Sequence, residues 1–365
     1  MSKSDSDALV GILTELVAMK TVTADVDACS AAIQTLKNRF EAAKMFVTTL
    51  ESNGHPSLVA TSRNTKHPKL LLAVHLDVVP GPDNLFTLKD DSGKLYGRGV
   101  FDMKFALAIY MHMVDQIGDD LAQHDFGILV TCDEEVGGSN GVRYILEQGW
   151  GTDVCLLPDG GDNWQLEASA KGAWFVKLRA QGKAAHGSRP WEGNNPINHL
   201  LRAIDKLQAH FQNSGPTKNS LTVAMIHGGE AINQGPATAE ASLDIRYLQA
   251  ADRQTIESYV AEACQPDAIT YETISQLDPH QTDMDNPFVS QFMSVVEKAR
   301  NTPMSTTASN GATDARFFAP YKTPVIVFRP DGGGAHGEDE WVSVDGLVTM
   351  YNILNKYLEH IRSVS

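Results

Sequence analysis

Cysteine is scarce in this chain of 365 residues, and the four that occur are scattered. Cys29, Cys132, Cys155 and Cys264 form no CxxC pair, so neither a zinc ribbon nor a disulfide framework is indicated. We therefore expect four reduced cysteines inside hydrophobic cores, as is usual in a cytoplasmic protein.

The sequence also has no long apolar runs and has fewer basic than acidic residues. The first ten residues, "MSKSDSDALV", lack the basic and apolar segments of a secretory leader, and no later stretch approaches the length of a membrane span. Lysine and arginine together number 30 against 45 acidic residues, giving a net charge of −15. This charge disfavours binding to nucleic acid or to an anionic membrane surface, and it suits a protein that collects cations. We expect a cytoplasmic protein with neither nucleic acid nor membrane as a partner.

The length exceeds what one hydrophobic core usually supports, so two domains are expected. Near-continuous apolar segments such as "KLLLAVHLDVV", "FGILVTCDEE" and "DVCLLPD" alternate with expected helices in 7–19, 24–43 and 139–148. Apolar strands separated by helices are typical of an α/β domain with a mostly parallel sheet. The C-terminal segment "TPVIVFRP" has the same character and is expected to complete that sheet.

Between these parts the strands become alternately apolar and polar, with helices expected in 195–212 and 252–264. The order β-α-β-β-α-β matches the ferredoxin-like split motif. We therefore expect an inserted α+β domain over 171–282, and a discontinuous outer domain built from 1–170 and 283–365.

The strand "VHLDVVP" contains a histidine and an aspartate two positions apart, so His75 and Asp77 point to the same face. A buried carboxylate is costly unless it is paired. One interpretation is a satisfied core pair. The other is a metal site in which His75 binds a cation while Asp77 holds the other ring nitrogen.

Acids and histidines recur at the ends of the other expected strands. Each has a structural interpretation: Asp102 as a helix N-cap, Asp159 as a turn residue, the acidic run as a solvated loop. Ligands bind at the carboxyl ends of strands in open α/β sheets, and so many acids at one edge would repel each other without cations. The residues are His75, Asp77, Asp102, Asp133, Glu134, Glu135, Asp159 and His336. Such nitrogen and oxygen donors favour a hydrolytic two-metal site, with zinc, cobalt and manganese all acceptable.

Seven motifs in order carry a resemblance to a known family: "HLDVVP", "LYGRGVFDMK", "CDEEVGG", "PDGG", "AHGSRPWEGNNPI", "GATDARFF" and "GGGAHGEDEWV". The chain resembles the dinuclear zinc peptidases that include acetylornithine deacetylases, succinyl-diaminopimelate desuccinylases, carboxypeptidase G-type enzymes and aminoacylases. The resemblance implies a zinc-hydrolase catalytic domain with an inserted dimerisation lid and two Zn²⁺ per chain, which Co²⁺ or Mn²⁺ could replace.

The resemblance also assigns the ligands. His75 and Asp159 would hold one zinc, Glu135 and His336 the other, and Asp102 would bridge both. Asp77 would then orient His75. Glu134, adjacent to a ligand, would be the general base that deprotonates the metal-bound water, because a carboxylate whose lone pairs bind zinc cannot accept that proton.

In the inserted domain, His186 matches a histidine that reaches from one subunit into the active site of the other to stabilise the oxyanion. Asn233 and Arg246 match positions that contact substrate, and Arg316 resembles a carboxylate-binding arginine. For either arginine a structural salt bridge is an equal alternative. Phe105 departs from the family pattern, and it either narrows the cleft or packs the following helix.

These assignments predict a homodimeric metallopeptidase or deacylase that cleaves an amide bond next to a free carboxylate. Its substrate would be an N-acyl amino acid, a dipeptide or a peptide C-terminus, so deacylase, dipeptidase and carboxypeptidase all remain open. The alternative is a non-catalytic family member that binds a metabolite or a partner. Glu134 favours catalysis, because a binding protein has no use for an unliganded glutamate beside a set of ligands.

Overall fold

The computed structural model describes residues 3–212, 215–265, 267 and 269–363. These residues form two compact units. The first comprises the described residues up to Ala168, Thr282–Thr307 and those from Thr313 onward, and the second comprises Ser169–Gln281 with Ala308–Ala312. The main boundaries lie within two residues of those expected from the sequence. The short segment Ala308–Ala312, which groups with the second unit, was not expected there.

A six-stranded sheet forms the centre of the first unit, in the order β1-β2-β6-β3-β7-β17. Its bounds are β1 Phe46–Ser52, β2 His55–Thr61, β3 Leu70–His75, β6 Phe126–Thr131, β7 Val154–Leu156 and β17 Val325–Ile326. The strands β6, β3, β7 and β17 are parallel, whereas β1 and β2 run antiparallel to their neighbours. Every residue of β3 and β6 is buried, as expected for strands covered on both faces. The predicted α/β class is confirmed, and β17 shows the C-terminal part completing the sheet.

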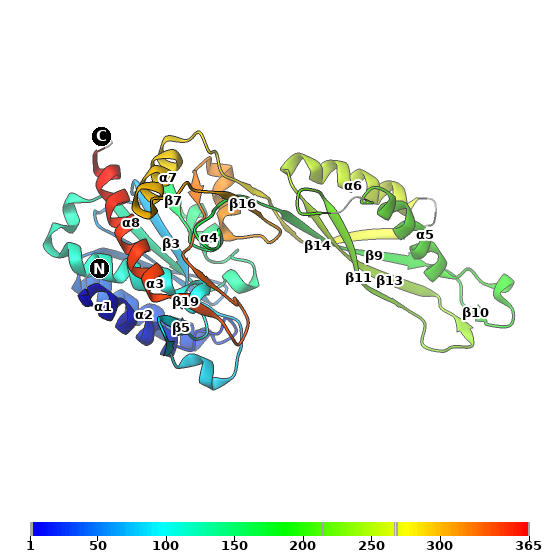
Figure 1. Cartoon of the computed structure of the whole chain (residues 1–365). Helices are drawn as coiled ribbons and strands as arrows, with labels where there is room; N and C mark the ends of the chain where they lie inside the picture. The colour runs from blue at the N-terminus through cyan, green and yellow to red at the C-terminus, as the bar shows by residue number, and fades with distance from the viewer. Residues whose placement is uncertain (1–2, 213–214, 266, 268, 364–365) are drawn as a thin grey trace. The chain divides into compact units, whose positions relative to one another are not determined.

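The helices of the first unit are α1 Lys3–Ala18, α2 Val26–Ala42, α3 Phe105–Ile117, α4 Val142–Glu147, α7 Pro287–Arg300 and α8 Val344–Ser363. Helices α1, α3 and α8 pack against one another, and α2 lies against β2 (Figure 1). Helix α2 begins after Asp25, whose carboxylate accepts the N–H of Ala28 at 3.0 Å. Phe105 opens α3 fully buried and stacks near Phe101, so it packs the helix.

Helix α4 is shorter than the helix expected over 139–148. The backbone N–H groups of Asn140 and Gly141 donate to Asp133 at 2.6 and 2.9 Å, which keeps this segment in a loop conformation. Competition between a side-chain carboxylate and helical hydrogen bonds thus delays the start of the helix. Hydrophobic periodicity does not report such a contact.

Short strands complete the first unit and its junctions. One sheet has the order β18-β19-β5-β4 and another has the order β15-β8-β16. Their bounds are β4 Lys89–Asp91, β5 Lys94–Tyr96, β8 Leu166–Ala170, β15 His280–Gln281, β16 Thr306–Ser309, β18 Gly332–Gly333 and β19 Trp341–Ser343. The loop between β18 and β19 contains His336.

The second unit is a four-stranded antiparallel sheet with two helices (Figure 1). Its elements follow as β9 Gly172–Gln181, α5 Pro196–Ala209, β11 Ser220–Gly228, β13 Thr238–Tyr247, α6 Ala250–Cys264 and β14 Ile269–Leu277, with the short pair β10 Ala185–His186 and β12 Gln234–Gly235. The sheet order β11-β13-β9-β14 is that of a ferredoxin-like fold. The predicted inserted α+β fold is therefore confirmed.

All four cysteines are buried with free thiols. Among the helices of the described residues, none has both the length and the apolar character needed to cross a membrane.

Candidate metal centre

The candidate site lies in the first unit, where the chain leaves its parallel strands. His75 is the last residue of β3, Glu134 and Glu135 form a tight turn after β6, and Asp159 follows β7. Asp102 lies in the irregular segment Val100–Lys104 that leads into α3. This is the edge of an α/β sheet at which ligands bind.

The ligand atoms fall into two groups, each with its atoms within 4.8 Å of one another. His75, Glu134 and Asp159 form one group. Asp102, Glu135 and His336 form the other. The structure therefore gathers every residue predicted to be a metal ligand, and it places Glu134 in the group of His75 and Asp159.

Asp102 lies between the two groups. Its Oδ1 is 3.3 Å from Nε2 of His75, and its Oδ2 is 3.1 Å from Nε2 of His336. The same nitrogen of His336 lies 3.0 Å from Oε2 of Glu135. Each oxygen of Asp102 thus faces a different histidine, which is the arrangement a carboxylate needs to serve two cations.

Asp77 supports both sides of this site from a fully buried position. Its backbone oxygen lies 3.0 Å from Nδ1 of His75, and its carboxylate Oδ1 is 3.6 Å from that nitrogen. The carboxylate also accepts the hydroxyl of Thr23 at 2.8 Å and the backbone N–H groups of Glu134 and Glu135 at 3.3 Å each. The sequence suggested the contact with His75 but not those with the glutamate turn.

The acidic side chains have opposite pKa shifts according to their surroundings. Burial, and then the charge of Asp159, raise the pKa of Glu134 well above its ordinary value. Burial, and then the charge of Asp102, do the same to the pKa of Asp159. For Asp102 burial acts in the same direction, but the hydrogen bonds from His336 and His75 outweigh it and hold the pKa well below its ordinary value.

The two histidines have raised pKa values. Burial opposes the charge of His75, yet its contacts with Asp102 and Asp77 raise the pKa well above the ordinary value. Hydrogen bonding to Asp102 and Glu135 raises the pKa of His336 to about 10. The carboxylates therefore attract positive charge to the ring nitrogens. A divalent cation between these donors would supply the same charge, and imidazole with carboxylate oxygen suits zinc, cobalt or manganese.

Two buried residues that sequence reasoning passed over hold the loops that contain Asp102 and His336. Glu340 accepts the N–H groups of Phe101 and Asp102 at 2.9 and 3.0 Å, and Arg98 donates to the backbone oxygen of His336 at 3.1 Å. Both residues stand inside quoted motifs, "LYGRG" and "GEDEWV". Their burial and their hydrogen-bond partners are not visible in the sequence, so the motifs alone did not assign them this role.

Another buried cation, Arg329, lies beside Asp102. Its Nη1 is 3.9 Å from Oδ1 of Asp102, and its Nε donates to Asp162 at 2.6 Å. Asp162 belongs to the loop that follows Asp159. Arg329 therefore places a fixed positive charge next to the acidic centre, and neither composition nor the strand pattern indicated it.

Arg316 is also buried in the first unit. Its guanidinium donates to the backbone oxygens of Thr313 and Gly137, the latter at 2.9 Å. Gly137 ends the turn that carries Glu134 and Glu135. The hydrogen bonds of Arg316 are therefore with the protein backbone, and its Nη2 also lies 3.7 Å from Oδ1 of the buried Asp314.

The remaining predicted residues lie in the second unit. Arg246 on β13 forms a two-point ion pair with Asp244, at 2.7 and 3.0 Å. His186 on β10 is exposed, and its Nδ1 lies 2.8 Å from the hydroxyl of Ser188. The backbone oxygen of Asn233 accepts the N–H of Gly187 at 2.7 Å.

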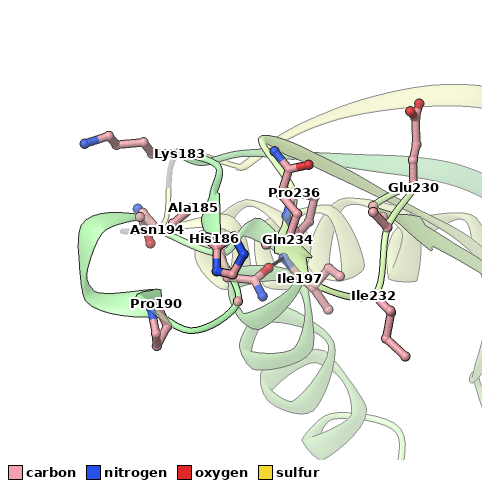
Figure 2. A pocket seen from close by; sticks show the side chains of 17 residues that line it. Lys183, Ala185, His186, Pro190, Asn194, Ile197, Glu230, Ile232, Gln234 and Pro236 are labelled. Carbon is pink, nitrogen blue, oxygen red and sulfur yellow. Dashed lines mark hydrogen bonds between the residues drawn. The ribbon is translucent and has the colours of Figure 1, made fainter.

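A cavity of about 540 Å³ in the second unit is lined by His186, together with Asn194, Glu230 and Gln234 among others. Figure 2 shows His186 and Gln234 close together, as expected for partners on the paired strands β10 and β12. The histidine therefore lines a cavity with both polar and apolar side chains, among the latter Ile197 and Ile232.

Comparison with known proteins identifies the family. The profile of peptidase family M20/M25/M40 matches residues 71–360, which covers most of the chain and both ligand groups. The chain belongs to this peptidase family. The predicted family, and with it the class of metal-dependent hydrolases, are confirmed.

Relatives of known name share about a quarter of their residues with this M20 family member. A succinyl-diaminopimelate desuccinylase of Stenotrophomonas maltophilia (strain R551-3) is 28% identical, with 97% of this chain and 99% of the relative covered. An acetylornithine deacetylase of Pectobacterium carotovorum subsp. carotovorum (strain PC1) is 29% identical, with 80% of each chain covered.

Solved structures share the fold at lower identity. A tripeptidase from Staphylococcus aureus superimposes with a TM-score of 0.82 at 20% identity, covering 98% of this chain and 99% of the other. A dinuclear metal-binding peptidase of the M20 family from Bacillus subtilis has a TM-score of 0.75 at 14% identity, with complete coverage of both chains. At these identities the likeness shows the fold of the M20 chain and not its substrate.

Proposed function

We propose that this M20 protein hydrolyses an amide bond adjacent to a free carboxylate in a small substrate, an N-acyl amino acid or a short peptide. The observation that carries the proposal is the pair of ligand groups joined by Asp102, with Glu134 beside one of them. The names of the desuccinylase, deacetylase and tripeptidase relatives support this class of substrate.

The residues fit two divalent ions, proposed to be Zn²⁺ with Co²⁺ or Mn²⁺ as substitutes. His75 and Asp159 would hold one ion, Glu135 and His336 the other, and Asp102 both. When bound by these residues, two such ions would supply polarisation of the amide carbonyl and a lower pKa for the attacking water.

Glu134 is proposed as the general base, which takes the proton of the attacking water and returns it to the leaving amine. Its carboxylate belongs to the same cluster as His75 and Asp159, so it is within reach of a water at that position. Its backbone is fixed by the hydrogen bond to Asp77. Asp77 therefore orients both the base and the histidine ligand.

Substrate binding is assigned to Asn233 and Arg246 in the second unit. Arg246 has 28% of its side chain exposed, and its fork can exchange Asp244 for a substrate carboxylate. Arg316, with 3% exposure, already donates to two backbone oxygens, so we assign it to supporting the glutamate turn.

A homodimer is proposed through the second unit. Strand β11 is an edge of its sheet, and Met225 and Ile226 on it are 53% and 44% exposed. An exposed apolar edge strand is suited to pairing with another chain. In such a dimer His186 would donate a hydrogen bond to the oxyanion in the partner's site. Four free, buried thiols support the cytoplasm as the compartment.

The test is hydrolysis of N-acetyl amino acids, N-succinyl amino acids and dipeptides by zinc-loaded and cobalt-loaded protein. We expect turnover of at least one class, and a loss of about a hundred- to ten-thousand-fold in kcat for Glu134→Gln with the metals retained. Metal-loaded protein that hydrolyses no member of the panel, or a Glu134→Gln variant with normal turnover, would refute the proposal. Binding of substrate without turnover would favour a non-catalytic member of the family.

A further inference from the structure

A buried ion pair outside the ligand groups connects the two loops that carry Asp102 and His336. Glu340, which is 2% exposed, accepts the backbone N–H groups of Phe101 and Asp102 on Oε1, at 2.9 and 3.0 Å. Its Oε2 accepts the N–H of Gly99 at 2.9 Å and Nη1 of Arg98 at 3.0 Å. The carboxylate therefore lies in a cradle of backbone donors that belongs to the Asp102 segment.

Arg98 makes the matching contacts with the other loop. Its Nη1 also donates to the backbone oxygen of Gly337 at 3.0 Å, and its Nη2 donates to that of His336 at 3.1 Å. A longer contact of 3.5 Å joins Nη2 to the backbone oxygen of Pro80, which follows the strand that carries His75. Arg98 is 3% exposed, so these bonds form in a region from which water is excluded.

We infer that the Arg98–Glu340 pair is a positioning device that fixes Asp102 relative to His336 and so sets the affinity for the ion held by Asp102, Glu135 and His336. The inference rests on the proposed function, because it assumes that this group binds a metal. Asp102 is 238 residues from Glu340 in sequence, so chain connectivity does not fix the two loops against each other.

The geometry predicts that breaking the ion pair lowers the affinity for the ion at Glu135 and His336 more than the affinity for the ion at His75 and Asp159. A metal site tolerates only about 0.2 Å of error in its ligand distances. The Asp102–His336 separation of 3.1 Å depends on both loops, which the ion pair holds. In contrast, His75 is held by β3 and by the backbone of Asp77, and Glu134 by the carboxylate of Asp77. The bonds described for Arg98 and Glu340 reach neither of these side chains.

Two substitutions break the pair in different ways. Glu340→Gln keeps the size of the side chain but turns an NH₂ group toward backbone N–H donors. Arg98→Lys keeps the charge but loses the planar fork that reaches Gly337, His336 and Glu340 together. Val348→Ala in α8 is the matched control, since it removes buried volume from the same unit at a residue that makes none of these contacts.

The experiment is calorimetric titration of metal-free protein with Zn²⁺, repeated with Co²⁺. Wild type and Val348→Ala should bind two ions per chain with the same affinities. Glu340→Gln and Arg98→Lys should each bind one ion about ten- to a hundred-fold more weakly, as is typical when a partner of a metal ligand is lost, and should weaken binding of the other ion by less, although Asp102 serves both. On a His336→Ala background, which removes the more strongly affected site, Glu340→Gln should weaken binding of the remaining ion by less than about ten-fold.

The outcomes separate the inference from the function on which it rests. Wild-type protein that binds fewer than two ions would refute the proposed two-metal site and this inference with it. Two ions in wild type, together with unchanged or equally weakened affinities in the variants, would overturn the inference alone. If Glu340→Gln fails to fold, Arg98→Lys alone provides the test. Unequal weakening of the two metal affinities in this variant would support the inference, and unchanged or equally weakened affinities would overturn it.

Discussion

Replacing Asp77 by Asn tests how the site is held together, because this carboxylate contacts both metal-site segments. In wild type its Oδ2 accepts from Thr23 and from the N–H of Glu135, and its Oδ1 accepts from the N–H of Glu134. An asparagine has one oxygen, so it can keep only one side of this arrangement. Its NH₂ group must face a backbone N–H on the other side.

The magnitude follows from the bonds lost. A hydrogen bond to a charged acceptor contributes about 1.5–3 kcal/mol, and a buried donor left without an acceptor costs about 1–3 kcal/mol more. Asp77 is fully buried, so solvent does not replace the missing acceptor. We expect Asp77→Asn to lower the free energy of unfolding of the metal-free protein by about 3–5 kcal/mol. Thr23→Val, which removes a single hydroxyl donor, should cost about 1–2 kcal/mol.

The assay combines urea unfolding of the metal-free proteins with metal titration. In addition to the lower unfolding midpoint, Asp77→Asn should weaken metal binding by about ten- to a hundred-fold, because His75 and the glutamate turn lose their common support. A variant with the midpoint and both affinities of wild type would refute the argument. Equal midpoint shifts in Asp77→Asn and Thr23→Val would show that the backbone contacts of Asp77 contribute nothing.

Three further predictions concern other parts of the chain. Asp102→Ala should remove activity and reduce bound metal, since the two oxygens of Asp102 face His75 of one ligand group and His336 of the other; unchanged metal content by elemental analysis would contradict the bridge. If His186 acts across a dimer, mixing inactive His186→Ala and Glu134→Ala dimers should restore up to half the wild-type rate per mixed dimer. Verified subunit exchange without recovery of activity would contradict the role of His186 in the partner's site. Burial raises the pKa of Glu167 to about 7 from an unfolded value near 4.5, so its folded form binds the proton more tightly. The free energy of unfolding of wild type should therefore fall as pH rises from about 4.5 to 7, by at most about 3 kcal/mol. The urea unfolding midpoint of Glu167→Gln should fall less over the same pH range. Equal changes of the midpoint with pH in the two proteins would contradict this.

Much of the fold was accessible from the sequence because it depends on hydrophobic pattern. Runs such as that of β3 have no polar face, which predicts a strand covered on both sides. The alternating strands of the second unit indicated a sheet with one solvated face, and the element order then selected the ferredoxin-like topology. The clustering of acids and histidines was accessible for a similar reason, since the ends of parallel strands meet at one edge.

The supports of the site were not accessible, because they consist of contacts between side chains and distant backbone atoms. Nothing in the letters around Glu340 shows that it accepts from Gly99, Phe101 and Asp102. Likewise, the residue type of Arg316 is compatible with a substrate carboxylate, whereas its guanidinium donates to backbone carbonyl groups and pairs with Asp314. Such partners are decided by the path of the chain in three dimensions.

The wide separation of Arg98 and Glu340 along the chain fixes the order in which this protein can mature on the ribosome. Domains generally fold as units while synthesis proceeds. Nearly all of the second unit is one continuous segment, Ser169–Gln281, and can fold as soon as it has emerged. The sheet of the first unit must wait for β17, and the cradle around Asp102 must wait for Glu340. A nascent chain therefore carries all of the proposed acidic ligands before it can bring them together, and the late loop that contains His336 and Glu340 completes the candidate centre.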